Sequence, residues 1–319
     1  LRFIKGLVDT QDIDLNVSRE MLQNNPAVAK ISKSLVGKIL RELKKVSEKN
    51  ADGYKSFWKE YGAVLKEGLY EDAERKEALL DLCRFSTNEN DDPISLSGYV
   101  EKMPEKQKDI YYISAETKDQ ALASPHLEGF KSKKIPVLIM TDAIDQFWLP
   151  MVGSFKEKKF TSITQGQINL DDLDEKNKDK KKDDKNEKEK KDKEYVDLVA
   201  QLKVVLGDQV KDIRLSSKLT DSPVCLVADE GDMDIAMEQL MAQRDTNYKG
   251  APRILEINGD HSLIKNMKSL LSKKENNDLV SDAGTLLFEQ ARLMEGKMPA
   301  DPAQFSKIMN QFLLKAIPN

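Results

Sequence analysis

The sequence lacks the features that mark several large classes of protein. Only two cysteines occur among its 319 residues, Cys83 and Cys225, which is too few for a disulfide scaffold and typical of a reducing compartment. No apolar run approaches the roughly 18 residues that span a membrane. The chain has 51 basic and 55 acidic residues, and this near balance gives no global reason to expect a nucleic-acid partner.

Signatures of enzymes are also scarce. The sequence contains no Gly-rich phosphate loop of the Walker type and no GxGxxG motif. His126 and His261 are far apart and lack the neighbouring ligands of a zinc site. Cys83 and Cys225 lie in helix-like and strand-like apolar stretches, which favours core thiols over nucleophiles. We therefore predict no metal site and no self-contained active site.

The most abundant feature is charge, which one-third of the residues carry. Residues 171–194 concentrate it, with 11 acids and 10 bases among 24 positions. Such a segment buries too little apolar surface to offset its ordering entropy, so a solvated linker or insertion is predicted, with an interaction tail as the alternative. Lys and Glu also favour helix, so part of it can be helical. The predicted domains are residues 1–170 and 195–319, and the charged run separates them.

Both flanking blocks mix helices with strands, so the predicted fold class is mixed α/β (α+β). In the first block, apolar periodicity predicts a helix over 28–43 and another over 52–61. Alternating strands and helices then predict a βαβ unit with parallel strands, at 110–113, 117–123, 137–140, 144–151 and 160–163. In the second block we predict a helix at 195–206, strands at 210–215, 224–228 and 253–257, and helices at 281–295 and 301–316. Asp301 and Pro302 suit the start of the last helix.

Residues 14–24 form an unusual polar stretch, DLNVSREMLQN. Arg19 and Gln23 are four residues apart, which places them on one face of a helix. A guanidinium and an amide on one face can clamp a phosphate. Spacing alone does not separate this interpretation from a solvated helix start.

Several segments, in order along the chain, resemble landmarks of the ninety-kilodalton heat-shock chaperone family. They are the stretch 14–24, FWKEYG at 57–62, LKEG at 65–68, RFST at 84–87, IYYI at 110–113, SPHLE at 124–128, TDAID at 141–145, VKDIRL at 210–215 and LTDSP at 219–223. The resemblance covers almost the whole chain outside 171–194 and is strongest to bacterial members. It implies a fragment that begins within the middle domain and continues through the C-terminal domain. The opening Leu1, in place of Met, also suggests a fragment.

The resemblance implies an ATP-driven, homodimeric, cytoplasmic bacterial chaperone. ATP and magnesium are expected in the full-length protein, with no cofactor and no hydrolysis in this fragment. By motif match, Arg19 and Gln23, with Asn16 in support, contact the γ-phosphate in the full-length protein. The end of the chain, Ala316-Ile317-Pro318-Asn319, lacks the acidic tail on which tetratricopeptide co-chaperones dock.

Two segments are candidates for binding non-native client proteins. Met233, Met237, Leu240 and Met241 follow a helical stripe, which by itself is typical of a core helix. Flexible thioethers also suit adaptable binding surfaces, and the family places a client-contacting helix here. Phe147 and Trp148 are adjacent, so they cannot both face one core. The family places a client-contacting aromatic near this point, and Phe147 is the closer match.

The two C-terminal helices carry the predicted dimer interface. Their apolar stripes also suit packing within the chain, but the family pairs these helices with their symmetry mates. The predicted interface residues are Leu286, Leu287, Leu293, Met294, Phe305, Ile308, Met309, Phe312 and Leu313. The predicted function is a client-binding chaperone fragment without nucleic-acid or membrane partners. The alternative is a non-enzymatic adaptor with two interaction modules joined by a charged hinge.

Overall fold

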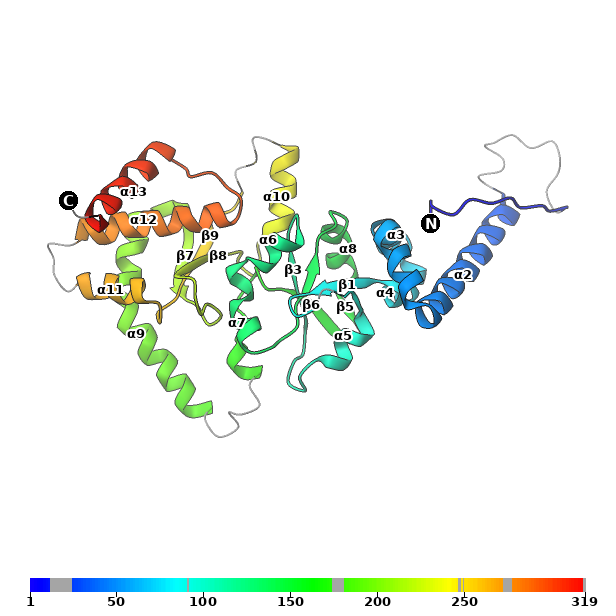
Figure 1. The fold of residues 1–319 in the computed structure, drawn as a ribbon, viewed down its shortest axis with the longest axis horizontal. Coiled ribbons are helices and arrows are strands. Elements are labelled where there is room, and N and C mark those ends of the chain that lie inside the picture. Colours follow the sequence, from blue (N-terminus) through cyan, green and yellow to red (C-terminus); the bar gives the residue numbers. More distant parts are fainter. Residues whose placement is uncertain are drawn as a thin grey trace. The chain divides into compact units, whose positions relative to one another are not determined.

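The computed structural model describes residues 1–11, 25–90, 92–173, 181–245, 248, 250–271 and 277–317. The chain forms two compact units. Unit 1 contains residues 1–102 and 142–160, and unit 2 contains 103–141 and 161–319. Both units mix helices and strands, which confirms the predicted fold class (Figure 1). These units are not the predicted domains, whose boundaries stay a prediction.

Three successive helices dominate unit 1. They are α2 (Pro26–Lys49), α3 (Ala51–Glu71) and α4 (Lys76–Leu82), with a 3₁₀ turn at Ala73–Arg75. Asn25 is the N-cap of α2 and precedes Pro26, the first residue of that helix. Asn50 lies between α2 and α3 and is the N-cap of α3, where its side chain accepts a hydrogen bond from the Gly53 N–H. Both predicted helices are confirmed and are longer than predicted. The second continues past residue 61 because Leu65 and Leu69 extend its buried face.

The rest of unit 1 consists of short elements beside these helices. They are β1 (Arg84–Thr87), β2 (Ile94–Ser95), α5 (Leu96–Lys102), α8 (Asp145–Val152), β5 (Ser154–Phe155) and the first part of β6 (Lys158–Ser162). Strands β1 and β2 pair antiparallel, as do β5 and β6. Helix α8 packs on α3. Cys83, between α4 and β1, is fully buried, which confirms a core thiol.

Unit 2 begins with the predicted βαβ arrangement. Strands β3 (Ile110–Ser114) and β4 (Leu138–Met140) pair in parallel, with Ile113 opposite Ile139. Helix α6 (Lys118–Leu122), the 3₁₀ turn η2 (Pro125–Leu127) and α7 (Glu128–Ser132) connect them. Thr117 and Gln120 form a reciprocal capping box at the start of α6. The buried apolar cluster under these elements includes Leu127 and Phe130.

The charged run enters a helix before it ends. Helix α9 spans Lys181–Leu206, so it begins fourteen residues before the predicted start at residue 195. Lys and Glu are good helix formers, and the apolar residues from Tyr195 onward anchor the C-terminal half of α9 in a core. Glu194 and Lys191 also form ion pairs, with Lys268 and Asp260 respectively.

A three-stranded sheet organises the rest of unit 2. Its order is β7-β9-β8, with β7 (Val210–Leu215) parallel and β8 (Val224–Val227) antiparallel to β9 (Arg253–Ile257). These strands confirm the three that were predicted. Four further helices follow strands of this sheet or one another: α10 (Ile235–Arg244), α11 (Ser262–Leu271), α12 (Asn277–Met294) and α13 (Pro302–Ala316).

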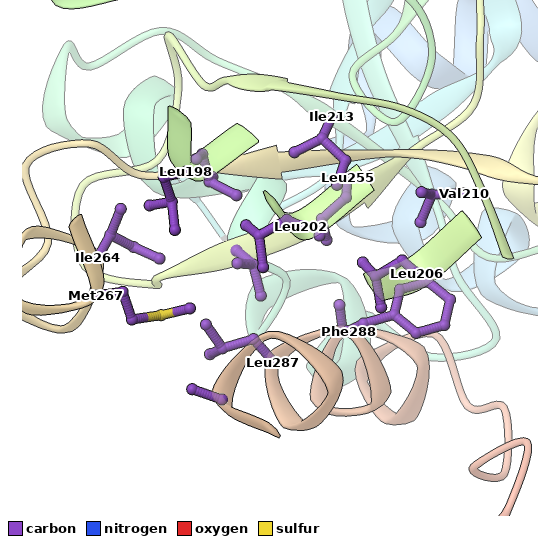
Figure 2. Packing of buried hydrophobic residues seen from close by; sticks show 14 of the residues in the cluster. Leu198, Leu202, Leu206, Val210, Ile213, Leu255, Ile264, Met267, Leu287 and Phe288 are labelled. Atoms are coloured by element: carbon purple, nitrogen blue, oxygen red, sulfur yellow. The ribbon is translucent and has the colours of Figure 1, made fainter. Parts of the chain in front are cut away.

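The core of unit 2 lies between this sheet and its helices. Figure 2 shows leucines of α9 meeting Leu255 of β9, Met267 of α11, and Leu287 and Phe288 of α12. Asp301 caps α13 by accepting a hydrogen bond from the backbone N–H of Gln304, as its position before Pro302 predicts. Helix α11 was not predicted from the sequence.

Candidate functional site

Three of the family-like landmarks meet around one buried lysine in unit 1. The Lys66 side chain, 4% exposed, lies 2.8 Å from an Asp142 oxygen and 2.9 Å from Asp145. Its ammonium group also lies 4.9 Å from the centre of the Phe85 ring. Segments 65–68, 84–87 and 141–145 therefore converge, although they are widely separated in the sequence.

The electrostatics of this cluster keep the lysine charged. Burial alone lowers the pKa of Lys66, but the charges of Asp145 and Asp142 outweigh it and raise that pKa. Burial raises the pKa of the Asp145 carboxyl, which Lys66 partly offsets. Asp145 also accepts hydrogen bonds from Trp148 Nε1 (2.6 Å) and from the Asp142 N–H (3.2 Å). The cluster therefore fixes the first turn of α8.

This arrangement decides between the two adjacent aromatics of α8. Trp148 is fully buried, and its ring packs against Phe85 and Phe160. The prediction that Trp148 contacts clients is therefore corrected, because its indole N–H and its ring are both used inside the unit. Phe147 is half-buried, and the centre of its ring lies 6.3 Å from that of Tyr70 of α3 in an edge-on contact.

Phe147 belongs to a small surface that the sequence alone did not reveal. Tyr70 is 50% exposed, and Met151, one turn after Phe147, is 58% exposed. We call Tyr70, Phe147 and Met151 the aromatic surface. The four-residue spacing of Phe147 and Met151 indicates one face of a helix, but the contact of Phe147 with Tyr70 depends on how α3 and α8 pack.

The predicted methionine stripe lies on and beside α10 in unit 2. Met237, Leu240 and Met241 are half-buried on this helix, whereas Met233 is 40% exposed and precedes it. The helix begins later than the stripe implies because Asp234 is its N-cap, accepting from the Ala236 N–H. We call Met233, Met237, Leu240 and Met241 the methionine surface. Only Ile235 and Glu238 of α10 are fully buried, so the stripe is not its core-facing side.

Two further landmarks meet in unit 2 at the carboxylate of Glu128. Its oxygens accept backbone N–H bonds from three successive residues, Thr220, Asp221 and Ser222, at 2.8–3.1 Å. Burial alone raises the pKa of the Glu128 carboxyl, but the hydrogen bonds from Ser222 and the backbone amides outweigh it and lower that pKa.

The neighbouring glycine permits this contact. A Cβ on Gly129 would lie 2.6 Å from the Lys218 carbonyl oxygen, so only glycine fits without a backbone shift. SPHLE and LTDSP are therefore contacting partners, although 92 residues separate Glu128 from Thr220.

The predicted dimer-interface residues divide into buried and exposed sets. Leu287 and Ile308 are each 5% exposed and belong to the chain's own core, which corrects their assignment to an interface. Leu286, Phe305 and Phe312 are half-buried. The more exposed apolar residues form what we call the C-terminal apolar surface: Leu293, Met294, Met309, Leu313 and Leu314, at 41–78% exposure. Leu314 was not among the predicted residues.

The predicted phosphate-contacting residues, Asn16, Arg19 and Gln23, lie outside the described residues. Within the described part of the chain, no group of three or more His, Cys, Asp and Glu side chains is arranged to hold a metal ion. No described helix is both long and apolar enough to cross a lipid bilayer. His126 is buried in the 3₁₀ turn η2.

Comparison with known proteins gives a consistent result along the chain. The family model described as Hsp90 protein matches residues 1–318. A "Chaperone protein HtpG" from Roseobacter denitrificans is 44% identical over 99% of this chain and 51% of its own length. Proteins of the same name from Paramagnetospirillum magneticum and Streptomyces coelicolor are 43% and 39% identical over 99% and 97% of this chain, and over 50% and 48% of their own lengths. The chain thus spans about half the length of the curated relatives that it matches. Because the family model matches residues 1–318 and these relatives match almost the whole chain, the chain belongs to the Hsp90 protein family.

Proposed function

We propose that this chain is the part of an Hsp90-family chaperone that binds non-native proteins and self-associates. The observation that carries the proposal is the exposure of flexible and aromatic side chains beside well-buried cores. Thioether and aromatic side chains can adapt to many apolar partners. The aromatic surface and the methionine surface supply two such groups, and the names of the relatives agree with a chaperone role.

Client binding is tested by removing apolar character from α10 without breaking the helix. The double variant Met237→Gln/Met241→Gln keeps good helix formers at both positions. We expect it to suppress the aggregation of a thermally unfolded enzyme about fivefold less well, as for loss of central contact residues. Light scattering measures the suppression, and far-UV circular dichroism checks the helix content.

The matched control is Arg244→Gln, which changes an exposed residue at the end of the same helix. Equal suppression by the two variants would contradict a role for the methionine surface. A chain that suppresses no aggregation even without substitutions would instead favour the adaptor interpretation.

Self-association is proposed to use the C-terminal apolar surface in a two-fold contact between identical helices. Met309 and Leu313 lie one turn apart on α13 and are 41% and 50% exposed. We expect the chain to have twice its own mass of 36.2 kDa in multi-angle light scattering, and Met309→Glu/Leu313→Glu to have the mass of one chain.

The control for this experiment is Asn310→Glu/Gln311→Glu, which adds the same charge at exposed polar positions of α13. It should keep the doubled mass. Removal of residues 301–319 is also expected to give monomers. It would, however, remove Ile308 and Phe312 from the packing of the chain itself, so the point variants test the interface more specifically. A doubled mass for the Met309→Glu/Leu313→Glu variant would refute the proposed interface.

A further inference from the structure

Helix α10 is held mainly by polar contacts. Of its ten residues, only Ile235 and Glu238 are buried, so little apolar area fixes its orientation. Its first turn is in contact with β9. Arg253 of β9 forms an ion pair with Glu238, and its Nη1 donates to the Met233 carbonyl oxygen at 3.1 Å. Both partners of the ion pair are 96% buried or more.

A second contact reaches the same turn from a different part of unit 2. One Asp234 oxygen accepts the Ala236 N–H at 2.9 Å and caps the helix. The other oxygen accepts the hydroxyl groups of Thr164, at 2.9 Å, and of Ser162. Ser162 and Thr164 are buried, and their hydroxyls lie 2.8 Å apart. One carboxylate therefore joins a helix cap to a buried hydroxyl pair that lies 70 and 72 residues earlier in the chain.

The segment that contains these hydroxyls also contacts residues 228–232, which lead into α10. The Gln165 side-chain amide donates to the carbonyl oxygens of Asp232 (2.7 Å) and Glu230 (3.2 Å). The Ala228 N–H donates to the Thr164 carbonyl, and the Gly166 N–H donates to the Ala228 carbonyl. We call residues 162–166 the seat, because residues 228–234 rest on it along their length.

We propose that Asp234 is a positioning residue, which fixes the orientation of α10, and with it the methionine surface, on the seat. This inference rests on the proposed client-binding function only for its consequence, not for the contact itself. Because the seat begins with Ser162, the last residue of β6, the Asp234 carboxylate links the end of β6 directly to the start of α10. A carboxylate suits this role because hydrogen bonds to a charged acceptor are stronger than neutral ones.

Two variants separate the contact from the helix cap. Asp234→Ser keeps an N-capping side chain but is too short to reach the hydroxyl pair. Ser162→Ala/Thr164→Val removes the hydroxyls and leaves the Asp234 cap intact. Each should raise amide hydrogen exchange in residues 235–244 by about tenfold, because a charge-assisted bond no longer holds the helix. Combining the variants should add little, since both remove one contact.

The matched control is Ser217→Ala, which removes another hydroxyl bond of unit 2, from Ser217 to the Ile168 carbonyl. It should leave exchange in α10 unchanged. Affinity for a fluorescently labelled, reduced and unfolded polypeptide should fall severalfold in the seat variants and stay unchanged in this control.

Each outcome decides a separate point. Unchanged exchange in α10, or a uniform rise across unit 2, would overturn the positioning role. Faster exchange with unchanged affinity would show that the contact does not position the methionine surface for clients, which also overturns the inference. If the unsubstituted chain binds no unfolded polypeptide, the proposed function fails, while hydrogen exchange still tests whether Asp234 holds α10.

Discussion

Replacing Lys66 by methionine is expected to lower the free energy of unfolding of unit 1 by about 3–5 kcal/mol, the usual effect of removing one partner of a buried ion pair. Methionine nearly fills the space of the lysine chain but leaves Asp145 without a counter-charge. Asp145 is fully buried and cannot gain water in exchange. Trp148 and the Asp142 backbone still donate to it, but neither carries a positive charge.

The measurement follows from where the tryptophans lie. The chain contains two, Trp58 and Trp148, and both belong to unit 1. Tryptophan fluorescence during urea unfolding therefore reports on the unit that contains Lys66. The matched control is Lys44→Met, which breaks a half-exposed ion pair with Asp81 at 3.2 Å in the same unit. That change should cost less than about 1 kcal/mol. Equal losses for Lys44→Met and Lys66→Met would contradict the proposed importance of the buried cluster.

A second change separates charge from packing. In Lys66→Met/Asp145→Asn the uncompensated charge is gone, while Asn can still accept from the Trp148 indole N–H. We expect the double variant to be more stable than Lys66→Met alone, because the two positions are in contact and their effects are not additive. If Asp145→Asn instead adds a further loss, the cost of Lys66→Met would come from packing and not from the buried charge.

The second large effect concerns the full-length protein. We propose that Arg19 acts there as an arginine finger toward ATP, with Gln23 and Asn16 as supporting contacts. Arg19→Ala should then lower kcat for ATP hydrolysis by about 10³, the lower range for such arginines, and change KM little. The reason is that charge on the transferred phosphoryl group develops in the transition state, where a guanidinium stabilises it most.

Steady-state ATP hydrolysis by the full-length protein measures this effect. The control is Arg41→Ala, which removes an exposed arginine on α2 and should leave kcat unchanged. Normal turnover in Arg19→Ala would refute the assignment. A rise in KM with kcat unchanged would indicate a ground-state binding contact instead.

The sequence predicted helices and strands well where local features, such as apolar runs and capping residues, determine where the element begins and ends. The bounds of β7 and β9 agree with those predicted from their apolar runs, and Asp301 with Pro302 marked the start of α13. Boundaries were missed where tertiary contacts extend an element. Helix α9 begins within the charged run because its far end is anchored in the core of unit 2. Helix α11 has an apolar face, but we did not assign it from the sequence.

The candidate binding surfaces were likewise predicted only in part from the sequence. Spacing brought Met237, Leu240 and Met241 to one side of a helix, and the structure keeps them there. The spacing did not predict that Asp234, after Met233, is the N-cap of the helix, or that Ile235 and Glu238 form its buried side. Tyr70 joined Phe147 only through the packing of α3 on α8.

By itself, the sequence determined the family, the mixed α/β class and the periodic faces of the helices, because these follow from order and spacing along the chain. Only the tertiary structure decided which side chain of each face is buried. In the structure Trp148 is buried and Phe147 is only half-buried, and Leu287 and Ile308 are buried in unit 2. The structure also places Lys66 against Asp145, and Glu128 against residues 220–222. The physical reason is that burial and charge pairing depend on contacts between residues far apart in the chain, which periodicity within one helix or strand does not specify.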